Sequence, residues 1–220
     1  MKDQSGEIDL KELERQLSCP TGAVGLEVAR NMHENNLGMT VNTIDFLDLR
    51  DSHAVLELGH GNCNHLSILI EKARNLRYQG LELSETMYEE AQRCNANLMR
   101  RHDISFTLYD GNRIPFDDHT FDRIMTVNTI YFWKNPEAFI QEIARVLKPD
   151  GRAVISYVQK EFMKKLPFIG DVFRLYDDND VRALVDKSSR KLIEIAARTE
   201  SVKTRTGELV TRPYAMAAVG

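Results

Sequence analysis

The chain has 220 residues, of which 42% are hydrophobic and 28% charged, and its formal net charge is −4. This length suits one domain with modest additions. The composition excludes a mostly disordered chain, which would lack the apolar surface needed to offset its conformational entropy. A slightly acidic chain has no electrostatic reason to bind a phosphate backbone, so a dedicated nucleic-acid-binding protein is not expected.

Cysteine usage and the N-terminal sequence indicate a cytoplasmic protein. The three cysteines, Cys19, Cys63 and Cys94, form no C-x-x-C pair. This argues against a disulfide scaffold or a four-thiolate zinc site and fits a reducing compartment. Residues 1–17 are charged throughout and lack the apolar core of a signal peptide. No run approaches the ~20 apolar residues of a membrane span, so no contact with a membrane is expected.

The first fifty residues are expected to form a helical extension. Four apolar residues recur there at roughly helical spacing, Ile8, Leu10, Leu13 and Leu17. Pro20 and Gly22 interrupt this pattern. A second helix is expected over residues 23–36, ending near Gly38, and a third over residues 42–49.

Strands and helices are expected to alternate from residue 53 to residue 157. Short apolar runs predict strands at 54–58, 76–83, 104–109, 121–127 and 152–157. Helices are expected at 65–74, from the cap Ser84 to about Met99, and after Asn135, with a turn at 148–151. This alternation implies right-handed crossovers and an α/β fold with a parallel, doubly wound sheet.

The last third departs from that pattern. Residues 159–176 contain Pro167, Gly170 and several large apolar residues, and they resemble an inserted segment. A helix is expected at 180–188 and strands at 191–199 and 214–219. The connection between these strands is too short for a crossover helix, so an antiparallel hairpin is predicted at the end of the sheet.

The end of the first predicted strand and the loop after it have the sequence E-L-G-H-G-N-C, from Glu57 to Cys63. Ligands of open α/β sheets bind beyond the carboxyl ends of the strands, and glycines bring backbone amides close to them. The G-x-G-x-C spacing is an incomplete dinucleotide fingerprint. The Glu57 carboxylate would repel phosphate and attract a cation such as an ammonium group. The alternative is a plain strand-to-helix turn.

Two further strand ends carry informative residues. Glu82 follows Gly61 by 21 residues, which places a carboxylate well for hydrogen bonds to ribose hydroxyls. Asp110, after the third strand, can accept a hydrogen bond from an adenine amino group. A solvent-facing glutamate and a simple D-G turn are the alternatives.

In this order and spacing, the motifs resemble the class I S-adenosylmethionine-dependent methyltransferases, in particular the small-molecule type called type 11. The resemblance covers roughly residues 53–157 and is carried by residues 55–62, 80–84 with Met87, 110–116, 121–122 and 146–152. It implies a Rossmann-like, mostly parallel, seven-stranded sheet with an antiparallel last strand. Residues 1–50 would then be a helical N-terminal extension or lid, and residues 51–220 the methyltransferase domain, with an inserted lid at 159–179.

The resemblance also implies roles for individual residues. The implied cofactor-binding residues are Glu57, Leu58, Gly59, His60, Gly61, Asn62, Cys63, Glu82, Leu83, Met87, Asp110, Gly111, Asn112 and Asn128. The first seven and Asn128 would surround the methionine part, Glu82 would bind the ribose, and the rest would flank or read the adenine. The family usually has a third glycine where this chain has Cys63, so weaker cofactor binding is expected.

Methyl transfer from a sulfonium is an in-line displacement, so the sequence assigns no catalytic base. A small-molecule acceptor is expected, with Tyr131, Trp133 and Phe168 as candidate pocket residues. The aromatic residues after the fourth strand could equally pack under the next helix.

Other functions are weighed against this one. His60, Cys63 and His65 form H-x-x-C-x-H, but no fourth ligand is evident, so no metal is expected. A non-catalytic S-adenosylmethionine-binding sensor or partner protein on the same fold is the main alternative, and Cys63 is the feature that favours it. A nicotinamide-dependent oxidoreductase fits the glycine spacing less well. The sequence gives no indication of the oligomeric state.

Overall fold

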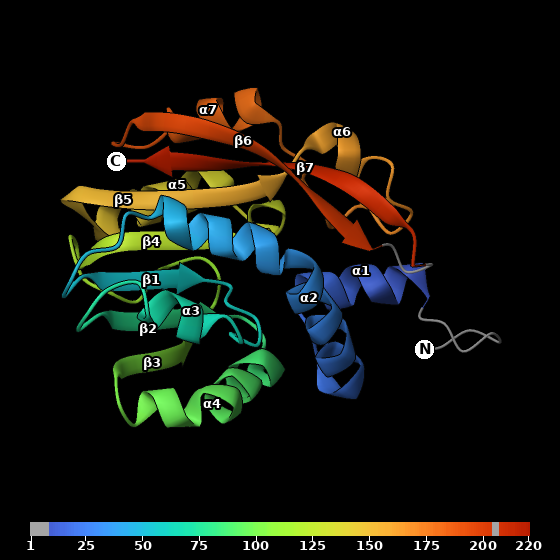
Figure 1. Cartoon of the computed structure of the whole chain (residues 1–220). Helices are drawn as coiled ribbons and strands as arrows, with labels where there is room; N and C mark the ends of the chain where they lie inside the picture. The colour runs from blue at the N-terminus through green and yellow to red at the C-terminus, as the bar shows by residue number, and fades with distance from the viewer. Residues whose placement is uncertain (1–8, 204–206) are drawn as a thin grey trace.

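A computed structural model describes residues 9–203 and 207–220. In this part of the chain, seven strands form one sheet in the order β3-β2-β1-β4-β5-β7-β6 (Figure 1). The strands are β1 (Ala54–Leu58), β2 (Arg77–Glu82), β3 (Asp103–Leu108), β4 (Phe121–Val127), β5 (Leu147–Val158), β6 (Leu192–Lys203) and β7 (Leu209–Val219). The first five pair in parallel, whereas β7 runs antiparallel to both β5 and β6. The predicted doubly wound sheet with an antiparallel last strand is confirmed.

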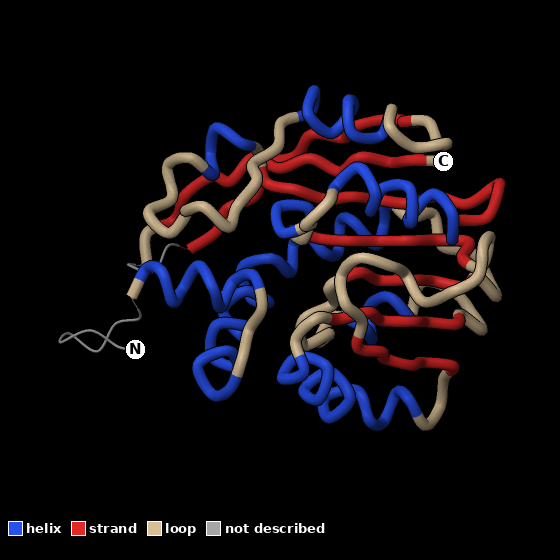
Figure 2. Tube along the Cα trace, turned by 180° about the vertical axis from the view of Figure 1, so that it is seen from behind, coloured by secondary structure: helices blue, strands red, loops and turns tan. Residues whose placement is uncertain are grey.

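Helices cover both faces of the sheet. They are α1 (Leu10–Ser18), α2 (Gly22–Phe46), α3 (Leu66–Ile70), α4 (Glu85–Met99), α5 (Pro136–Val146), α6 (Lys160–Met163) and α7 (Asp178–Val185), with a 3₁₀ turn, η1 (Ile130–Phe132). In Figure 1, α2 crosses in front of the sheet, and Figure 2 brings α5 and α7 to the front. All five residues of β1 are buried, which explains why four of them are apolar, the exception being Glu57.

Two helix starts lie where the sequence predicts them. The Ser84 hydroxyl accepts a hydrogen bond from Met87 N at 3.1 Å at the start of α4. The Asn135 side chain accepts one from Ala138 N at the start of α5, where Pro136 occupies the first turn. Each cap satisfies a backbone N–H that a helix start leaves unpaired.

The second and third predicted helices are wrong as separate elements, because α2 runs unbroken from Gly22 to Phe46. Gly38 lies inside it. A Cβ atom at Gly38 would lie 2.7 Å from Glu200 Oε2 of β6. The glycine therefore gives room for a neighbouring strand rather than ending the helix. The first predicted helix corresponds to α1, while Ile8 lies outside the described residues.

Other boundaries differ by a few residues. Helix α3 has only five residues, against ten predicted, and α7 begins earlier because Asp177 and Asp180 form a capping box. The predicted turn at 148–151 lies inside β5. Pairing with β4 jumps there from Leu147 to Arg152, so the four intervening residues bulge from the ladder. The predicted terminal hairpin is confirmed, with strands longer than expected.

The N-terminal helices contact distant parts of the chain. Arg212 of β7 donates to Asn36 Oδ1 at 2.9 Å and to Glu200 Oε1 at 2.7 Å, and Asn42 donates to the Tyr214 hydroxyl at 2.7 Å. These bonds join the middle of α2 to the β6–β7 hairpin. Among the described residues, no helix combines the length and the apolar character needed to cross a membrane.

Candidate functional site

The loop after β1 contains two glycines with left-handed backbone, Gly59 (φ 70°) and Gly61 (φ 57°). A Cβ atom at Gly59 would lie 2.5 Å from Thr129 Cγ2, so this glycine allows close approach to the chain after β4. A Cβ atom at Gly61 would meet no heavy atom within 4 Å. Gly61 therefore borders open space in which a ligand can approach the backbone.

Glu82, at the end of β2, is tied to this loop. Its side chain is buried, and Oε2 accepts a hydrogen bond from Gly61 N at 2.9 Å. Oε1 accepts bonds from Leu83 N at 2.8 Å and from Ser84 N at 3.1 Å. A carboxylate has about four lone-pair positions, so these three bonds leave room for one more on Oε2. The sequence-based pairing of Glu82 with the glycine loop is thus a direct contact.

The loop after β3 lies against Leu83. A Cβ atom at Gly111 (φ 75°) would lie 2.9 Å from Leu83 Cδ2. Leu83 is 40% exposed, which is unusual for a leucine beside a sheet, whereas Met87 is fully buried. Asp110 Oδ1 accepts bonds from Asn112 N at 2.8 Å and from Arg113 N. These backbone bonds lower the pKa of the Asp110 carboxyl, so it is ionised at neutral pH.

Glu57 is the centre of a buried polar network beneath the glycine loop. Its Oε2 accepts a hydrogen bond from the Tyr78 hydroxyl at 2.5 Å and lies 2.9 Å from His65 Nε2. Burial alone would raise the pKa of Glu57, but the charge and hydrogen bonds of His65 and Tyr78 outweigh it, and the pKa falls below its ordinary value. Glu57 is therefore held ionised beneath the loop.

Sequence reasoning missed two members of this network. His65 carried a signal only as part of the pattern H-x-x-C-x-H. Tyr78 lies 21 residues from Glu57, and no local pattern links them. Strand register could have found it, because Glu57 pairs with Gly80 on the neighbouring strand and Tyr78 lies two residues before it, on the same face.

Cys63 stands where the methyltransferases that this sequence resembles usually have a third glycine. Its backbone is left-handed (φ 51°). Its side chain is fully buried, and Sγ lies 3.2 Å from the Tyr78 hydroxyl. Burial raises the pKa of this thiol well above its ordinary value, so it stays protonated. The thiol thus packs beneath the loop, in contact with Tyr78. The expected weakening of cofactor binding stays a prediction.

His60 supports the loop from below. Its ring packs 4.8 Å from the Phe106 ring and close to Gly80, where a Cβ atom would lie 2.6 Å from His60 Cδ2. Nδ1 lies 2.7 Å from Gly61 O, and Nε2 has no hydrogen-bond partner. Burial lowers the pKa of His60 and keeps the ring neutral.

Three of these residues could also approach a metal ion. The donor atoms of Glu57, Cys63 and His65 lie within 4.8 Å of one another, and all three are buried. The Tyr78 hydroxyl contacts both Glu57 and Cys63, and His65 contacts Glu57 directly, so the three side chains are joined without an ion. The raised pKa of Cys63 opposes the thiolate form that binds zinc. The sequence-based expectation of no metal stays a prediction.

Asn128 directly follows β4 and has a left-handed backbone conformation (φ 58°). Its Oδ1 accepts a hydrogen bond from the Tyr131 hydroxyl at 3.0 Å, and that hydroxyl accepts one from Val158 N at 2.6 Å. Tyr131 therefore ties the ends of β4 and β5 together. Its ring is buried, so it has little surface left for an acceptor.

The other two candidate pocket residues differ in exposure. The Trp133 ring packs 4.8 Å from the Phe139 ring of α5, and its Nε1 donates to Thr129 Oγ1. These contacts match the alternative in which the aromatic residues pack under the next helix. Phe168, in the segment after α6, is half-buried. A direct contact of any of the three with an acceptor stays a prediction.

Comparison with known proteins finds similarity to methyltransferases. Residues 56–155 match the family model described as a methyltransferase domain. The match covers less than half of the chain, and it makes this region similar to S-adenosylmethionine-dependent methyltransferases. Among curated methyltransferases, the chain is 29% identical to YrhH of Bacillus subtilis over 113 residues, which is 51% of this chain and 62% of that protein. It is 35% identical to the demethylmenaquinone methyltransferase of Tropheryma whipplei over 98 residues, 44% of this chain and 37% of that protein.

The matched region spans less than two thirds of each of these methyltransferases. The fold extends further than the sequence match. The [4+2]-cyclase SpnF superimposes with a TM-score of 0.66 over 96% of this chain and 92% of that one, at 15% identity. A cyclase on the methyltransferase fold shows that the fold alone does not determine the reaction.

Proposed function

We propose that this chain transfers a methyl group from S-adenosylmethionine to a small-molecule acceptor. The observation that carries the proposal is the Glu82 carboxylate, held 2.9 Å from Gly61 N beside the open space at that glycine. Binding a ribose requires a carboxylate with a free lone pair beside a glycine, whose missing side chain lets the sugar approach the backbone. Glu82 and Gly61 provide these two features. The exposed Leu83 and the adjoining Gly111 provide a surface for a flat ring.

The residues of the site fit the cofactor part by part. Glu82 accepts hydrogen bonds from the ribose hydroxyls, and the loop at Gly111 reads the adenine edge with Asp110. The ionised Glu57 beneath the glycine loop favours the positive end of the methionine part. The remaining members of the predicted set surround these positions: Leu58, Gly59, His60, Gly61, Asn62, Cys63, Leu83, Met87, Asn112 and Asn128.

The bound cofactor supplies an activated methyl group and its leaving group. The chain contributes binding, alignment and the exclusion of water. Asn128 is fixed by Tyr131 at the end of β4, which positions its side chain beside the methionine end. No residue is assigned as a general base, because an acceptor that attacks without losing a proton needs none.

The N-terminal helices and the segment at 159–179 form the cap over the site. The Ser84 hydroxyl donates to Pro20 O, and Gly22 N donates to Thr86 Oγ1 at 3.0 Å, so the α1–α2 connection lies on the start of α4. On the other side, Val172 N donates to Glu14 Oε1 at 2.8 Å. Helix α1 thus bridges the ribose end of the site and the inserted segment, as a lid over both substrates would.

The acceptor is proposed to be a small molecule held beneath this cap. The aromatic side chains of Tyr131, Phe132 and Phe173 pack together where the inserted segment meets the end of β4. Phe168 of the same segment retains some exposure and is the best placed of the three candidate pocket residues. The name of the Tropheryma whipplei relative, a demethylmenaquinone methyltransferase, is consistent with an apolar acceptor.

A non-catalytic S-adenosylmethionine-binding protein remains the second candidate function. Cys63 is the observation that favours it, because it departs from the family's third glycine at the cofactor loop. A sensor would bind the cofactor and its product without modifying any acceptor.

Calorimetric titration with S-adenosylhomocysteine, with NAD as control, tests the proposal. We expect micromolar binding of S-adenosylhomocysteine, a loss of at least about 100-fold in Glu82→Lys because charge and lone pair are both removed, and no binding of NAD. Cys63→Gly should raise the affinity, because weaker binding is expected with a side chain at this position; a change of less than about twofold would show that the thiol beneath the loop does not affect the cofactor. Binding without methylation of any compound in a metabolite screen would favour the sensor, and preferential NAD binding would exclude both candidates.

A further inference from the structure

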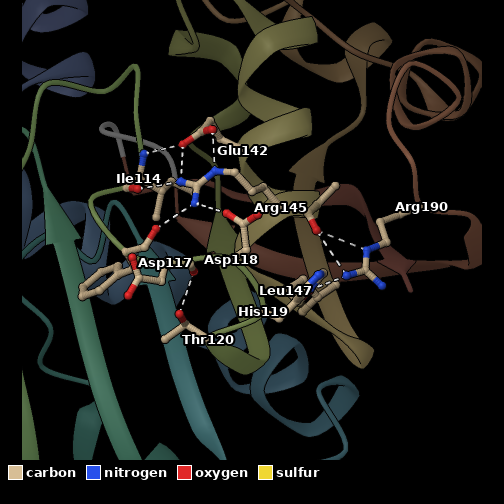
Figure 3. Close-up of polar contacts among 11 residues, drawn as sticks. Ile114, Asp117, Asp118, His119, Thr120, Glu142, Arg145, Leu147 and Arg190 are labelled. Atoms are coloured by element: carbon tan, nitrogen blue, oxygen red, sulfur yellow. Dashed lines mark hydrogen bonds and ion pairs between the residues drawn. The ribbon is translucent and has the colours of Figure 1, made fainter.

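The adenine-reading loop after β3 is held in place by two charged side chains from a different element. Residues 109–120 connect β3 to β4, and Glu142 and Arg145 lie on α5 (Figure 3). The Ile114 N–H donates to Glu142 Oε2 at 3.0 Å, and the Ile114 carbonyl accepts from Arg145 Nη2 at 2.9 Å. Both backbone groups of one loop residue are therefore bound by the same ion pair.

The Glu142–Arg145 ion pair is bidentate, the geometry by which arginine recognises a carboxylate. Arg145 Nε donates to Glu142 Oε1 at 2.8 Å, and Nη2 donates to Glu142 Oε2 at 2.7 Å. Arg145 Nη1 extends the contact to Phe116 O at 2.8 Å and to Asp118 Oδ1 at 2.9 Å. The two partners are only 24% and 22% exposed, so solvent screens them less than a surface pair.

These contacts fix the loop immediately beyond the residues that read the adenine. Ile114 follows Asn112 by two residues, its side chain is fully buried, and Asp110 already bonds the amides of the intervening turn. The end of the loop is anchored as well, because His119 N and Thr120 N donate to the carbonyls of Arg145 and Val146. Only a short part of the loop after β3 is therefore without bonds to α5, and the position of the loop depends on this helix.

We propose that Glu142 and Arg145 are positioning residues for the adenine end of the cofactor site, acting through the Ile114 backbone on Asp110 and Gly111. This inference rests on the proposed function. The pair does not touch the cofactor. It sets where the loop's backbone and the Asp110 carboxylate lie, and so how strictly the site distinguishes adenine from a base with a different edge.

Arg190 offers a matched control in the same region. Its guanidinium donates to Ala144 O, Leu147 O and Pro149 O at the carboxyl end of α5, and Figure 3 shows it on the far side of Leu147 from the loop. Arg190→Lys therefore removes a comparable set of arginine–carbonyl bonds without touching residues 110–118.

The experiment compares Arg145→Lys, Glu142→Gln and Arg190→Lys in the full chain. Affinity is measured calorimetrically for S-adenosylhomocysteine and for S-inosylhomocysteine, in which an oxygen replaces the adenine amino group. Backbone hydrogen exchange of residues 110–116 is measured without ligand. For Arg145→Lys and Glu142→Gln we expect about a tenfold loss of S-adenosylhomocysteine affinity, at least a threefold fall in the adenine preference, and faster loop exchange. Arg190→Lys should change the affinity, the adenine preference and the loop exchange rate by less than about twofold each.

The outcomes separate this inference from the proposed function. Folded Arg145→Lys with an unchanged base preference and unchanged loop exchange would overturn the inference while leaving the cofactor assignment intact. Equal losses in Arg145→Lys and Arg190→Lys would overturn it too, because they would reflect the stability of α5. If the wild-type chain bound neither ligand, the proposed function would fail and this role with it, whatever the loop exchange.

Discussion

The two halves of the proposed site are held together in different ways. On the cofactor side, Glu57, Glu82 and the loop after β1 are joined by short bonds between buried groups, many of them to the backbone. On the cap side, Glu14 joins α1 to the segment at 159–179, and Arg212 and Asn36 join the hairpin to α2; these three side chains are partly exposed. The first half is built into the sheet, whereas the second is attached to it.

This difference implies that the two halves differ in how easily they open. Buried hydrogen-bonded networks resist local opening, whereas elements held by a few partly exposed bonds open at lower free energy. A site that binds a cofactor and a separate acceptor, as proposed, needs a rigid cofactor side and a cap that can open. The following predictions test whether the two halves respond differently.

The largest effect is expected for His65→Ala on the cofactor side. The substitution removes the imidazole that contacts Glu57 and leaves a carboxylate that is 3% exposed with only the Tyr78 hydroxyl as a hydrogen-bond partner. Breaking a buried pair in this way lowers the free energy of unfolding by about 3–5 kcal/mol. Urea denaturation measures it. Tyr78→Phe serves as control and should lose about 1–2 kcal/mol, since one neutral donor is removed. A smaller loss in His65→Ala than in Tyr78→Phe would refute the importance assigned to the contact between His65 and Glu57.

An intermediate effect is expected for Arg212→Ala on the cap side. This side chain, 11% exposed, binds Glu200, Asn36 and the Asn35 carbonyl. We expect a loss of about 1–2 kcal/mol, with faster hydrogen exchange in α2 and the hairpin and unchanged affinity for S-adenosylhomocysteine. Arg93→Ala removes an ion pair whose arginine is 71% exposed and should change stability by less than about 0.5 kcal/mol. Faster exchange in the loop at Gly61 would show that the halves are not independent.

The smallest effect is expected for Gly38→Ala. Alanine in a helix interior is favoured over glycine by up to about 1 kcal/mol, but its Cβ would displace the Glu200 carboxylate. The two contributions should nearly cancel. In a Glu200→Ala background the obstacle is gone, and the same substitution should stabilise the chain by about 1 kcal/mol. Thermal denaturation of the four proteins checks this, and an identical effect in both backgrounds would contradict the assigned contact.

The same division explains what the sequence could predict. Strand–turn–helix units such as β1 with its glycine loop, or Ser84 with α4, are specified by neighbouring residues, so their patterns identify them. Gly38 was misread because its neighbour, Glu200, is 162 positions away along the chain. Tyr78 and Arg145 were missed for the same reason, since each acts on a segment about 20 to 30 residues away through the fold.

The continuity of α2 has a mechanical consequence. At 1.5 Å per residue, the path along the axis of its 25 residues is about 37 Å, and the helix bends along the way (Figure 1). One end is clamped in the core, where Thr43 bonds Ser156 at 2.6 Å and the next residue beyond the helix, Leu47, offers its carbonyl to Arg123. The other end carries the connection that rests on α4. The bonds at that connection and those of Asn36 and Asn42 to the hairpin therefore hold the rest of the helix at several separate points, so the loss of one bond leaves the others in place.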